Sequence, residues 1–201
     1  MLPEIFPLFH EKYPNIELEL LEGRSIQMRS ALMEGKIDVA VMNLSKVLNT
    51  TDLTSVSIFE EKNLLAVPSN HPEYLKYVNT KKNHTNPLFL LKRIPLLSTK
   101  PGQNLTTIVN YVLNKNNIEA NVILETGNLT TAINLVATGL GCAFVPEEGA
   151  SVCVHPGFVT YLTINDPDLK WMLSIVHRKD AYVNSIAQLF INTALEIWNK
   201  K

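Results

Sequence analysis

Short apolar segments of strand length alternate with amphipathic helical segments along this 201-residue chain, and this alternation restricts the fold to the α/β class. Residues 15–21 alternate apolar and polar side chains, which predicts a strand with one face in water. A helical stripe then runs to Gly35, and the nearly all-apolar residues 37–42 follow as a parallel strand covered on both faces. These three segments predict a βαβ unit.

The same alternation restarts in the second half of the chain. Further strands are expected at residues 94–98, 120–125 and 142–146, with helical stripes at 105–113 and 129–137 between them. Residues 76–87 are rich in Lys, Asn and Thr and predict an exposed loop. A last strand at 171–175 and an amphipathic helix at 183–198 remain after these two units.

This order predicts two Rossmann-like lobes joined by two crossover segments. We expect lobe one to contain residues 1–63 and 170–201, and lobe two to contain residues 64–169. Two crossings form a hinge, and the cleft between two such lobes is the natural place for a small ligand.

Composition and charge define the broad class of the protein. Hydrophobic residues make up 46% and charged residues 18%, which is typical of a soluble globular protein. The net charge of −1 gives no indication of a basic face that binds nucleic acid directly. The chain shows neither a secretory signal nor an apolar run of membrane-spanning length. Only Cys142 and Cys153 are present, which fits a reducing compartment. We therefore expect a cytoplasmic protein, and the lack of a long apolar run predicts no membrane partner.

Three predicted helix N-termini are candidates for ligand binding, because helix starts expose N–H groups and a partial positive charge that attract small anions. The candidate ligand-contacting residues are Gly23, Arg24, Ser25, Ser98, Thr99, Lys100 and Thr126. Gly23 lets the backbone approach a ligand, and Ser25 is expected to cap its helix. Ser98, Thr99 and Lys100 follow a strand directly, which is where ligand sites of α/β proteins usually lie.

Each candidate also has a purely structural interpretation. The segment around Gly23 is compatible with an ordinary turn and cap, and the segment after Ser98 with a polar connecting loop in which Lys100 is solvated. Asn128 is expected to be a structural helix cap, while Thr126, at the end of a strand, is the better ligand candidate.

The residue types give no indication of catalysis, of a metal site or of a cofactor. The five histidines are scattered, and no pair has close metal-ligand spacing. No Gly-x-Ser-x-Gly, Walker-type or dinucleotide-binding motif is present. Cys142 lies within an apolar strand, where a free thiol behaves as a small hydrophobic group, so a redox switch is not expected.

Several stretches of the chain, taken in order, match the pattern of a known family. They are Leu2-Pro3, Tyr13-Pro14-Asn15-Ile16-Glu17-Leu18, Glu22-Gly23, Gly35-Lys36-Ile37-Asp38-Val39-Ala40-Val41, Leu65-Ala66-Val67-Pro68, His71-Pro72 and Val136-Ala137-Thr138-Gly139-Leu140-Gly141-Cys142-Ala143-Phe144-Val145-Pro146. Each stretch is commonplace alone, but together they cover essentially the whole chain and resemble the effector-binding domains of LysR-type transcriptional regulators.

The resemblance implies a periplasmic-binding-protein-like (type 2) fold, a small effector held between the lobes, and a homodimer or tetramer. It implies that a winged helix-turn-helix and a linker helix normally precede this segment and that DNA is bound only through them. In the family, a first strand and loop also come before the Leu2-Pro3 helix, so lobe one is expected to lack an inner strand and one wall of its site.

We therefore expect the effector-sensing domain of a LysR-type regulator, which binds a small carboxylate or other oxyanion and is not an enzyme. The alternative is a solute-binding protein of a transporter, which shares the two-lobe plan but should carry a signal peptide or a lipoprotein cysteine. An enzyme on the same fold would need acid, base or nucleophile residues converging in the cleft, and the sequence indicates none.

Overall fold

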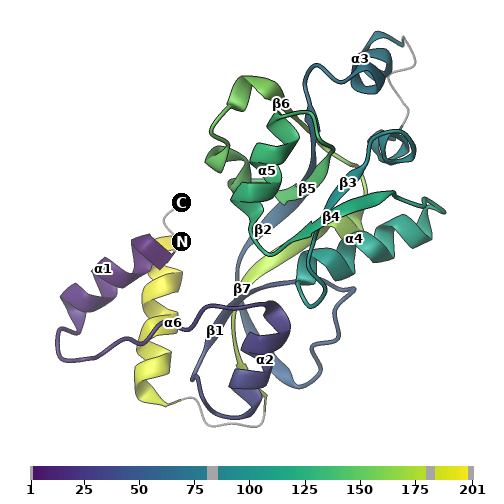
Figure 1. Ribbon diagram of the computed structural model, residues 1–201. Helices are drawn as coiled ribbons and strands as arrows, with labels where there is room; N and C mark the ends of the chain where they lie inside the picture. The colour runs from purple at the N-terminus through teal and green to yellow at the C-terminus, as the bar shows by residue number, and fades with distance from the viewer. Residues whose placement is uncertain (1, 81–85, 180–183, 199–201) are drawn as a thin grey trace. The chain divides into compact units, whose positions relative to one another are not determined.

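The computed structural model describes residues 2–80, 86–179 and 184–198 (Figure 1). Its helices are α1 (Leu2–Lys12), α2 (Ser25–Met33), α3 (Pro72–Asn79), α4 (Asn104–Lys115), α5 (Leu129–Ala137) and α6 (Ser185–Trp198). Its strands are β1 (Ala40–Leu44), β2 (Leu53–Pro68), β3 (Leu96–Thr99), β4 (Val122–Thr126), β5 (Ala143–Pro146), β6 (Val159–Leu162) and β7 (Lys170–Arg178). Short 3₁₀ helices lie at Pro87–Lys92, Glu148–Val152, Pro156–Phe158 and Pro167–Leu169.

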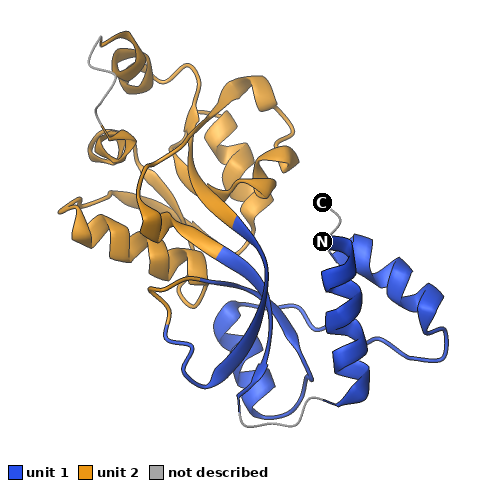
Figure 2. Ribbon diagram, turned by 180° about the vertical axis from the view of Figure 1, so that it is seen from behind, with its two compact units in different colours: residues 1–44, 49–60, 172–201 blue, residues 45–48, 61–171 orange. Residues whose placement is uncertain are grey.

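The chain divides into two compact units (Figure 2). Unit 1 comprises residues 1–44, 49–60 and 172–201, and unit 2 comprises residues 45–48 and 61–171. Strands β2 and β7 each contribute residues to both units, so each changes colour along its length in Figure 2. The boundaries expected from the sequence lie at 63/64 and 169/170.

In unit 1, strand β1 pairs with β7 in antiparallel register, with Ala40 opposite Val176. The strand predicted at residues 37–42 is present but begins at Ala40, and its predicted parallel direction is wrong. Its neighbour in the sheet is the late strand β7, and burial on both faces alone does not distinguish parallel from antiparallel pairing.

Two apolar clusters hold the helices of unit 1 in place. Helices α1 and α6 pack through Phe9 and Phe190, whose ring centroids are 5.5 Å apart in an edge-on arrangement. Helix α2 packs through Leu32 against Val176 and the buried face of β1. The stripe predicted for α2 is therefore only partly buried, since Ile26 and Met33 remain 58% and 44% exposed.

Residues 15–21 do not form the predicted strand, and the predicted βαβ unit is therefore absent from the described residues of this segment. The alternation is present, but a strand also requires a ladder partner for its backbone. None of the strands in the described part of the chain pairs with this segment, and Leu18 and Leu20 remain 42% and 53% exposed.

The strands of unit 2 belong to two sheets, linked by an isolated bridge between Leu96 and Cys142, and helices α4 and α5 pack on opposite faces of β2. The second half of β2 runs antiparallel to β5 and to β6, and β3 runs parallel to β4. Leu65 and Val67 of β2 belong to the cluster that contains the α4 stripe, while Leu64 and Ala66 belong to the cluster that contains the α5 stripe. Adjacent residues of one strand thus face two different helices, as the 2-residue period of a strand requires.

Two elements of unit 2 differ from the sequence-based expectation. Strand β2, whose second half lies in this unit, is a continuous 16-residue strand that is not among the strands expected from the sequence. Part of the expected loop at residues 76–87 is helix α3, which has Pro72 in its first turn and whose N-terminal His71 accepts a hydrogen bond from Glu73 N; residues 81–85 of that loop lie outside the described residues.

Within the described ranges, no helix is long and apolar enough to cross a membrane.

Candidate functional site

The ends of β3 and β4 bring three of the predicted site residues together in unit 2. The two strands are parallel, and their register pairs Thr99 with Thr126 and Ser98 with Glu125. The carboxyl ends of parallel strands meet at one edge of a sheet, which is where α/β proteins bind ligands. Because paired residues present their side chains to the same face, Thr99 and Thr126 share one face of this edge.

Lys100 is fixed to the same edge by its backbone. Its N–H donates a hydrogen bond of 3.1 Å to the Thr126 carbonyl oxygen. The side chain of Lys100 lies near Gly127, since a Cβ atom built there would be 4.0 Å from Lys100 Cδ. The backbone of Lys100 is thus held at the ends of both strands, while the residue remains exposed to solvent.

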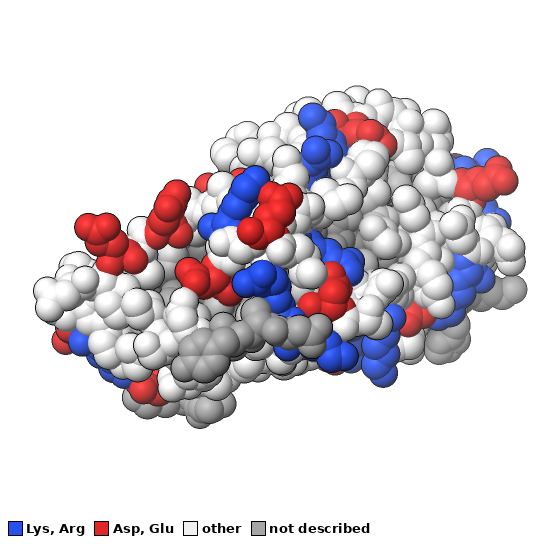
Figure 3. Space-filling model, turned by 90° about the horizontal axis from the view of Figure 1, so that it is seen from below, with Lys and Arg blue, Asp and Glu red and all other residues white. Residues whose placement is uncertain are grey.

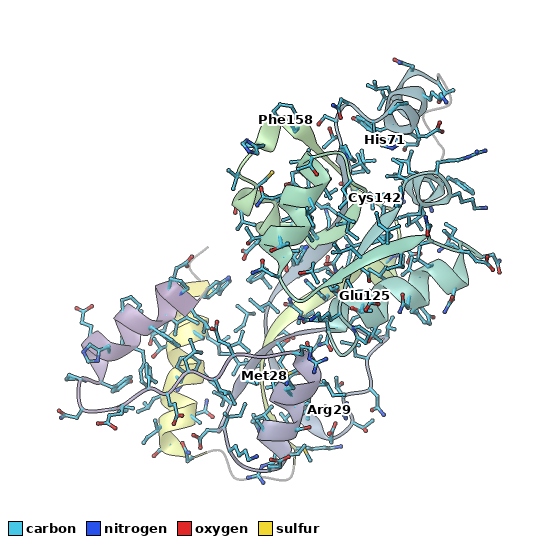
Figure 4. The ribbon with its side chains drawn as sticks, viewed as in Figure 1. Met28, Arg29, His71, Glu125, Cys142 and Phe158 are labelled. Atoms are coloured by element: carbon cyan, nitrogen blue, oxygen red, sulfur yellow. The ribbon has the colours of Figure 1, made fainter. Side chains whose placement is uncertain are left out.

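Ser98 is not brought to the same face as Thr99, because side chains alternate along a strand. Its hydroxyl donates to the Thr99 carbonyl oxygen at 3.1 Å. Its partner in register, Glu125, is an exposed carboxylate on β4 (Figure 4). The predicted cluster of Ser98, Thr99 and Lys100 is thus divided between two faces of β3.

The hydroxyl groups of Thr99 and Thr106 are in direct contact at 2.6 Å. Thr106 lies in the first turn of α4 and is 9% exposed. Its Oγ1 also lies 3.0 Å from the carbonyl oxygens of Thr99 and Lys100. A small cavity lined by β3, the first half of α4 and Phe144 of β5 adjoins these groups. Thr106 was not a candidate from the sequence; the available signal is a polar residue within the buried stripe that begins at Leu105.

The loop after β4 is built around Asn128. The Asn128 side chain accepts a hydrogen bond of 3.0 Å from Thr131 N and caps α5, which confirms the structural role predicted for it. Asn128 N in turn donates to Thr126 Oγ1 at 3.1 Å. Thr126 therefore uses an acceptor position of its hydroxyl on the backbone of the loop.

The remaining candidates, Gly23, Arg24 and Ser25, lie at the start of α2 in unit 1. Ser25 is the first helical residue and Arg24 is the N-cap, so the prediction that Ser25 caps the helix is wrong by one position. The side chain of Gln27, three residues into the helix, reaches back to this cap: Arg24 N donates to the Gln27 side-chain oxygen at 3.0 Å. A side chain at Gly23 would approach Met28 Cε to 2.9 Å; Met28 is labelled on α2 in Figure 4.

The charged side chains give no sign of a nucleic-acid-binding face on the side of the molecule drawn in Figure 3. Lys and Arg are interspersed there with Asp and Glu. In the part of the chain that the structure describes, no three His, Cys, Asp or Glu side chains gather closely enough to hold a metal ion. Cys142 lies inside unit 2, where burial raises the pKa of its thiol to about 12.

A family model, the LysR substrate binding domain, matches residues 1–199. The chain belongs to this family. The effector-binding domain of a LysR-type transcriptional regulator, expected from the resemblance, is thereby confirmed, and with it the periplasmic-binding-protein-like fold of type 2.

Individual relatives agree with this assignment. The chain is 29% identical over 168 residues to the HTH-type transcriptional regulator BenM of Acinetobacter baylyi, covering 84% of this chain and 53% of BenM. Across the first curated relatives, the chain spans 53% to 64% of their length.

Solved LysR effector-binding domains have the same fold. The effector-binding domain of QuiR in complex with shikimate superposes with a TM-score of 0.79 at 17% identity, over 100% of this chain and 91% of that domain. The BenM effector-binding domain with benzoate superposes with a TM-score of 0.77 at 24% identity, over 99% of this chain and 86% of that domain.

Proposed function

We propose that this LysR-type domain binds a small carboxylate or other oxyanion through Thr99, Lys100 and Thr126. The observation that carries the proposal is the register of β3 and β4, which pairs Thr99 with Thr126, while Lys100 N donates to the Thr126 carbonyl oxygen. Two hydroxyl groups and one ammonium group then lie at the carboxyl edge of parallel strands, next to the N-terminus of α4. Ser98, on the other face of β3, and Gly23, Arg24 and Ser25, at the start of α2 in unit 1, are candidates from the sequence that this site does not use.

The cationic and hydroxyl character of the site supports an acidic effector. An oxyanion accepts a charge-assisted hydrogen bond from an ammonium group, as on Lys100, and an ordinary one from a hydroxyl group, as on Thr126. Shikimate and benzoate, the compounds bound by the QuiR and BenM domains, are both carboxylic acids. By this similarity, a small organic acid is the effector class that we propose here.

In a longer protein, effector binding would control transcription by changing the equilibrium between two states of the domain. A ligand shifts such an equilibrium only by its difference in affinity for the two states. We propose that the protein is cytoplasmic, acts as a homodimer or tetramer, contacts DNA through a winged helix-turn-helix outside this chain, and has no enzymatic activity. A coding sequence for that helix-turn-helix directly upstream would support the regulator, whereas a signal peptide there would support a transporter component.

Isothermal titration and thermal shift with a panel of small organic acids test the binding site. The panel contains shikimate, cyclohex-1-ene-1-carboxylate, benzoate and the three monohydroxybenzoates. The variants are Thr99→Ala, Lys100→Gln and Thr126→Ala, and the control is Thr130→Ala at an exposed position of α5. We expect each site variant to weaken the binding of at least one acid of the panel by roughly tenfold, the value of one hydrogen bond at the upper end of its range. The control is expected to bind every acid as the wild type does. If Thr99→Ala and Thr126→Ala both bind every acid with the affinity of the wild type, the proposed site is wrong.

A further inference from the structure

The hydrogen bonds of Thr106 fix the direction of the proton between two hydroxyl groups of the site. Thr106 Oγ1 lies 3.0 Å from the carbonyl oxygens of Thr99 and Lys100 and 2.6 Å from Thr99 Oγ1. A carbonyl oxygen only accepts hydrogen bonds, whereas a threonine hydroxyl has one proton to donate. The single proton of Thr106 therefore points at the two carbonyl oxygens. Any other orientation would place lone pairs of Thr106 Oγ1 against the lone pairs of the carbonyl oxygens.

It follows that Thr99 is the donor in the contact between the two hydroxyl groups. With the Thr106 proton on the carbonyl oxygens, the 2.6 Å contact can be a hydrogen bond only if the Thr99 proton lies in it. Thr99 Oγ1 then has no proton left for a ligand. What it presents at the edge of the sheet is a pair of acceptor positions.

Thr126 has the opposite polarity. Its Oγ1 accepts the N–H of Asn128 at 3.1 Å, and within the described residues its own proton meets no acceptor. Thr126 can therefore donate to a ligand. The two hydroxyl groups that β3 and β4 pair in register thus differ in polarity, with an acceptor at Thr99 and a donor at Thr126.

We propose that Thr106 is a specificity-determining residue that makes Thr99 a hydrogen-bond acceptor, so that the site selects acids that carry a hydroxyl or N–H group beside the carboxylate. The carboxylate lies toward Thr126 and Lys100, and the donor group of the effector lies toward Thr99. This inference rests on the proposed function, because it concerns the same site. Thr106 itself is a positioning residue, being 9% exposed and acting through Thr99.

The physical reason for selection is the cost of an acceptor without a donor. An acid that lacks a donor group leaves the Thr99 lone pairs unpaired as water is displaced, or places its own oxygen lone pairs against them. A site built to pair with a hydroxyl group discriminates strongly against the analogue without it, because a polar group of the protein is then left unpaired. We expect a preference of about tenfold or more for the hydroxylated acid.

Matched acid pairs and Thr106 variants test the proposal by isothermal titration. The pairs are shikimate with cyclohex-1-ene-1-carboxylate, and benzoate with its three monohydroxy isomers. In the wild type, at least one hydroxylated acid is expected to bind about tenfold more tightly than its parent acid. In Thr106→Val the Thr99 proton is released, so the affinities of the hydroxylated acid and its parent acid are expected to differ by no more than about threefold. Thr106→Ser keeps the hydroxyl group and is expected to restore the wild-type affinity ratio. Thermal melts of each variant establish that it is folded.

The outcomes separate this inference from the proposed site. If Thr99→Ala weakens binding but Thr106→Val keeps the wild-type ratio, the site stands and the inference is wrong. If Thr99→Ala and Thr126→Ala bind as the wild type does, or no acid of the panel binds the wild type, the proposed site and its effector chemistry are wrong, and the ligand preference falls with them.

Proton exchange in the ligand-free protein tests the proton direction independently of any ligand. The Thr99 hydroxyl proton is held between two oxygens 2.6 Å apart, so in NMR spectra it is expected to exchange with water more slowly than that of Thr126. Thr106→Val is expected to remove this difference. Equal exchange rates of the two hydroxyl protons in the wild type would overturn the assignment of donor and acceptor.

Discussion

The indole N–H of Trp171 donates a 2.7 Å hydrogen bond to Glu61 Oε2, and both side chains are buried in unit 2. Glu61 Oε1 accepts a second hydrogen bond of 2.9 Å from Glu148 N. Glu61 and Trp171 are the residues at which β2 and β7 enter unit 2. The carboxyl group thus ties the two strands together at the point where both pass from one unit to the other.

Glu61→Gln is predicted to destabilise the protein in a pH-dependent way. Glutamine places an NH2 group, which cannot accept, against one of the two N–H donors, whereas both oxygens of the carboxyl group can accept even when it is protonated. One buried hydrogen bond is therefore lost, at a cost of about 1–3 kcal/mol. Desolvation raises the pKa of Glu61, although its hydrogen bonds oppose that shift. The folded state therefore holds a proton that the unfolded state loses above about pH 4.3.

The free energy of unfolding of the wild type therefore exceeds that of Glu61→Gln by most below about pH 4. This difference shrinks as the pH rises through the raised pKa of Glu61. Urea unfolding between about pH 4 and pH 8 measures this difference in free energy. Glu119→Gln, at an exposed position, is the control. A difference that grows with pH would show that the carboxylate is the stabilising form.

The ion pair of Arg29 and Asp52 is predicted to contribute modestly to the stability of unit 1. Arg29 Nε donates to Asp52 Oδ2 at 3.0 Å, Nη2 donates to the other carboxylate oxygen, and Nη1 donates to the Asn49 carbonyl oxygen at 2.9 Å. Lysine cannot reproduce this geometry. Because the pair is about one-third exposed, Arg29→Lys is expected to cost only about 0.5–1 kcal/mol.

The pH dependence of this pair has the opposite sign to that of Glu61. The Arg29 hydrogen bond lowers the pKa of Asp52, so the stabilisation is present above about pH 3.9 and is lost as the pH falls through the lowered pKa. Urea unfolding of Arg29→Lys and of the control Lys36→Gln, which removes a fully exposed pair with Glu34, measures the effect. A loss of stability in the control equal to that in Arg29→Lys would contradict a specific role for the pair.

Gly141→Ala is predicted to disturb the junction of β3 and β5. An added Cβ would lie 2.5 Å from the Pro95 carbonyl oxygen, a backbone atom that already accepts a hydrogen bond from Cys142 N. Relief requires movement of the backbone, at a cost of about 1–3 kcal/mol. Gly157→Ala is the matched control, since nothing lies within 4 Å of its added Cβ, and a change below about 0.5 kcal/mol is expected there. Equal urea midpoints for the two variants would refute the argument.

The sequence predicted elements well where the local pattern alone decides them. The stripe of α5 and its Asn128 cap are examples, because caps and helical period are set within a few residues. Prediction failed where distant partners decide. Residues 15–21 have the alternation of a strand but no ladder partner among the described strands, and β1 proved antiparallel because its neighbour is β7.

The candidate site was predictable in its residue types and not in its arrangement. The rule that ligands bind at strand ends singled out Thr99 and Thr126, but only the register of β3 and β4 shows that they face the same side. The same register separates Ser98 from them. Thr106 was missed because a threonine within a buried stripe is read as part of the core, and its three polar contacts come from residues six and seven positions earlier.

The two cysteines are predicted to differ sharply in reactivity. Cys142 is fully buried, burial raises the pKa of its thiol to about 12, and its Sγ lies 3.3 Å from the Pro95 carbonyl oxygen. Because the thiolate is the reactive form, Cys142 is expected not to react with Ellman's reagent in the folded protein. Cys153 is only partly buried and should react.

Native protein is therefore expected to release one equivalent of chromophore per chain, and urea-unfolded protein two. Cys153→Ser is expected to abolish the native signal and to keep one equivalent after unfolding, whereas Cys142→Ser should keep the native signal. Rapid labelling of the folded Cys153→Ser variant would mean that the strand carrying Cys142 opens to solvent, and a redox role for this thiol would then have to be considered.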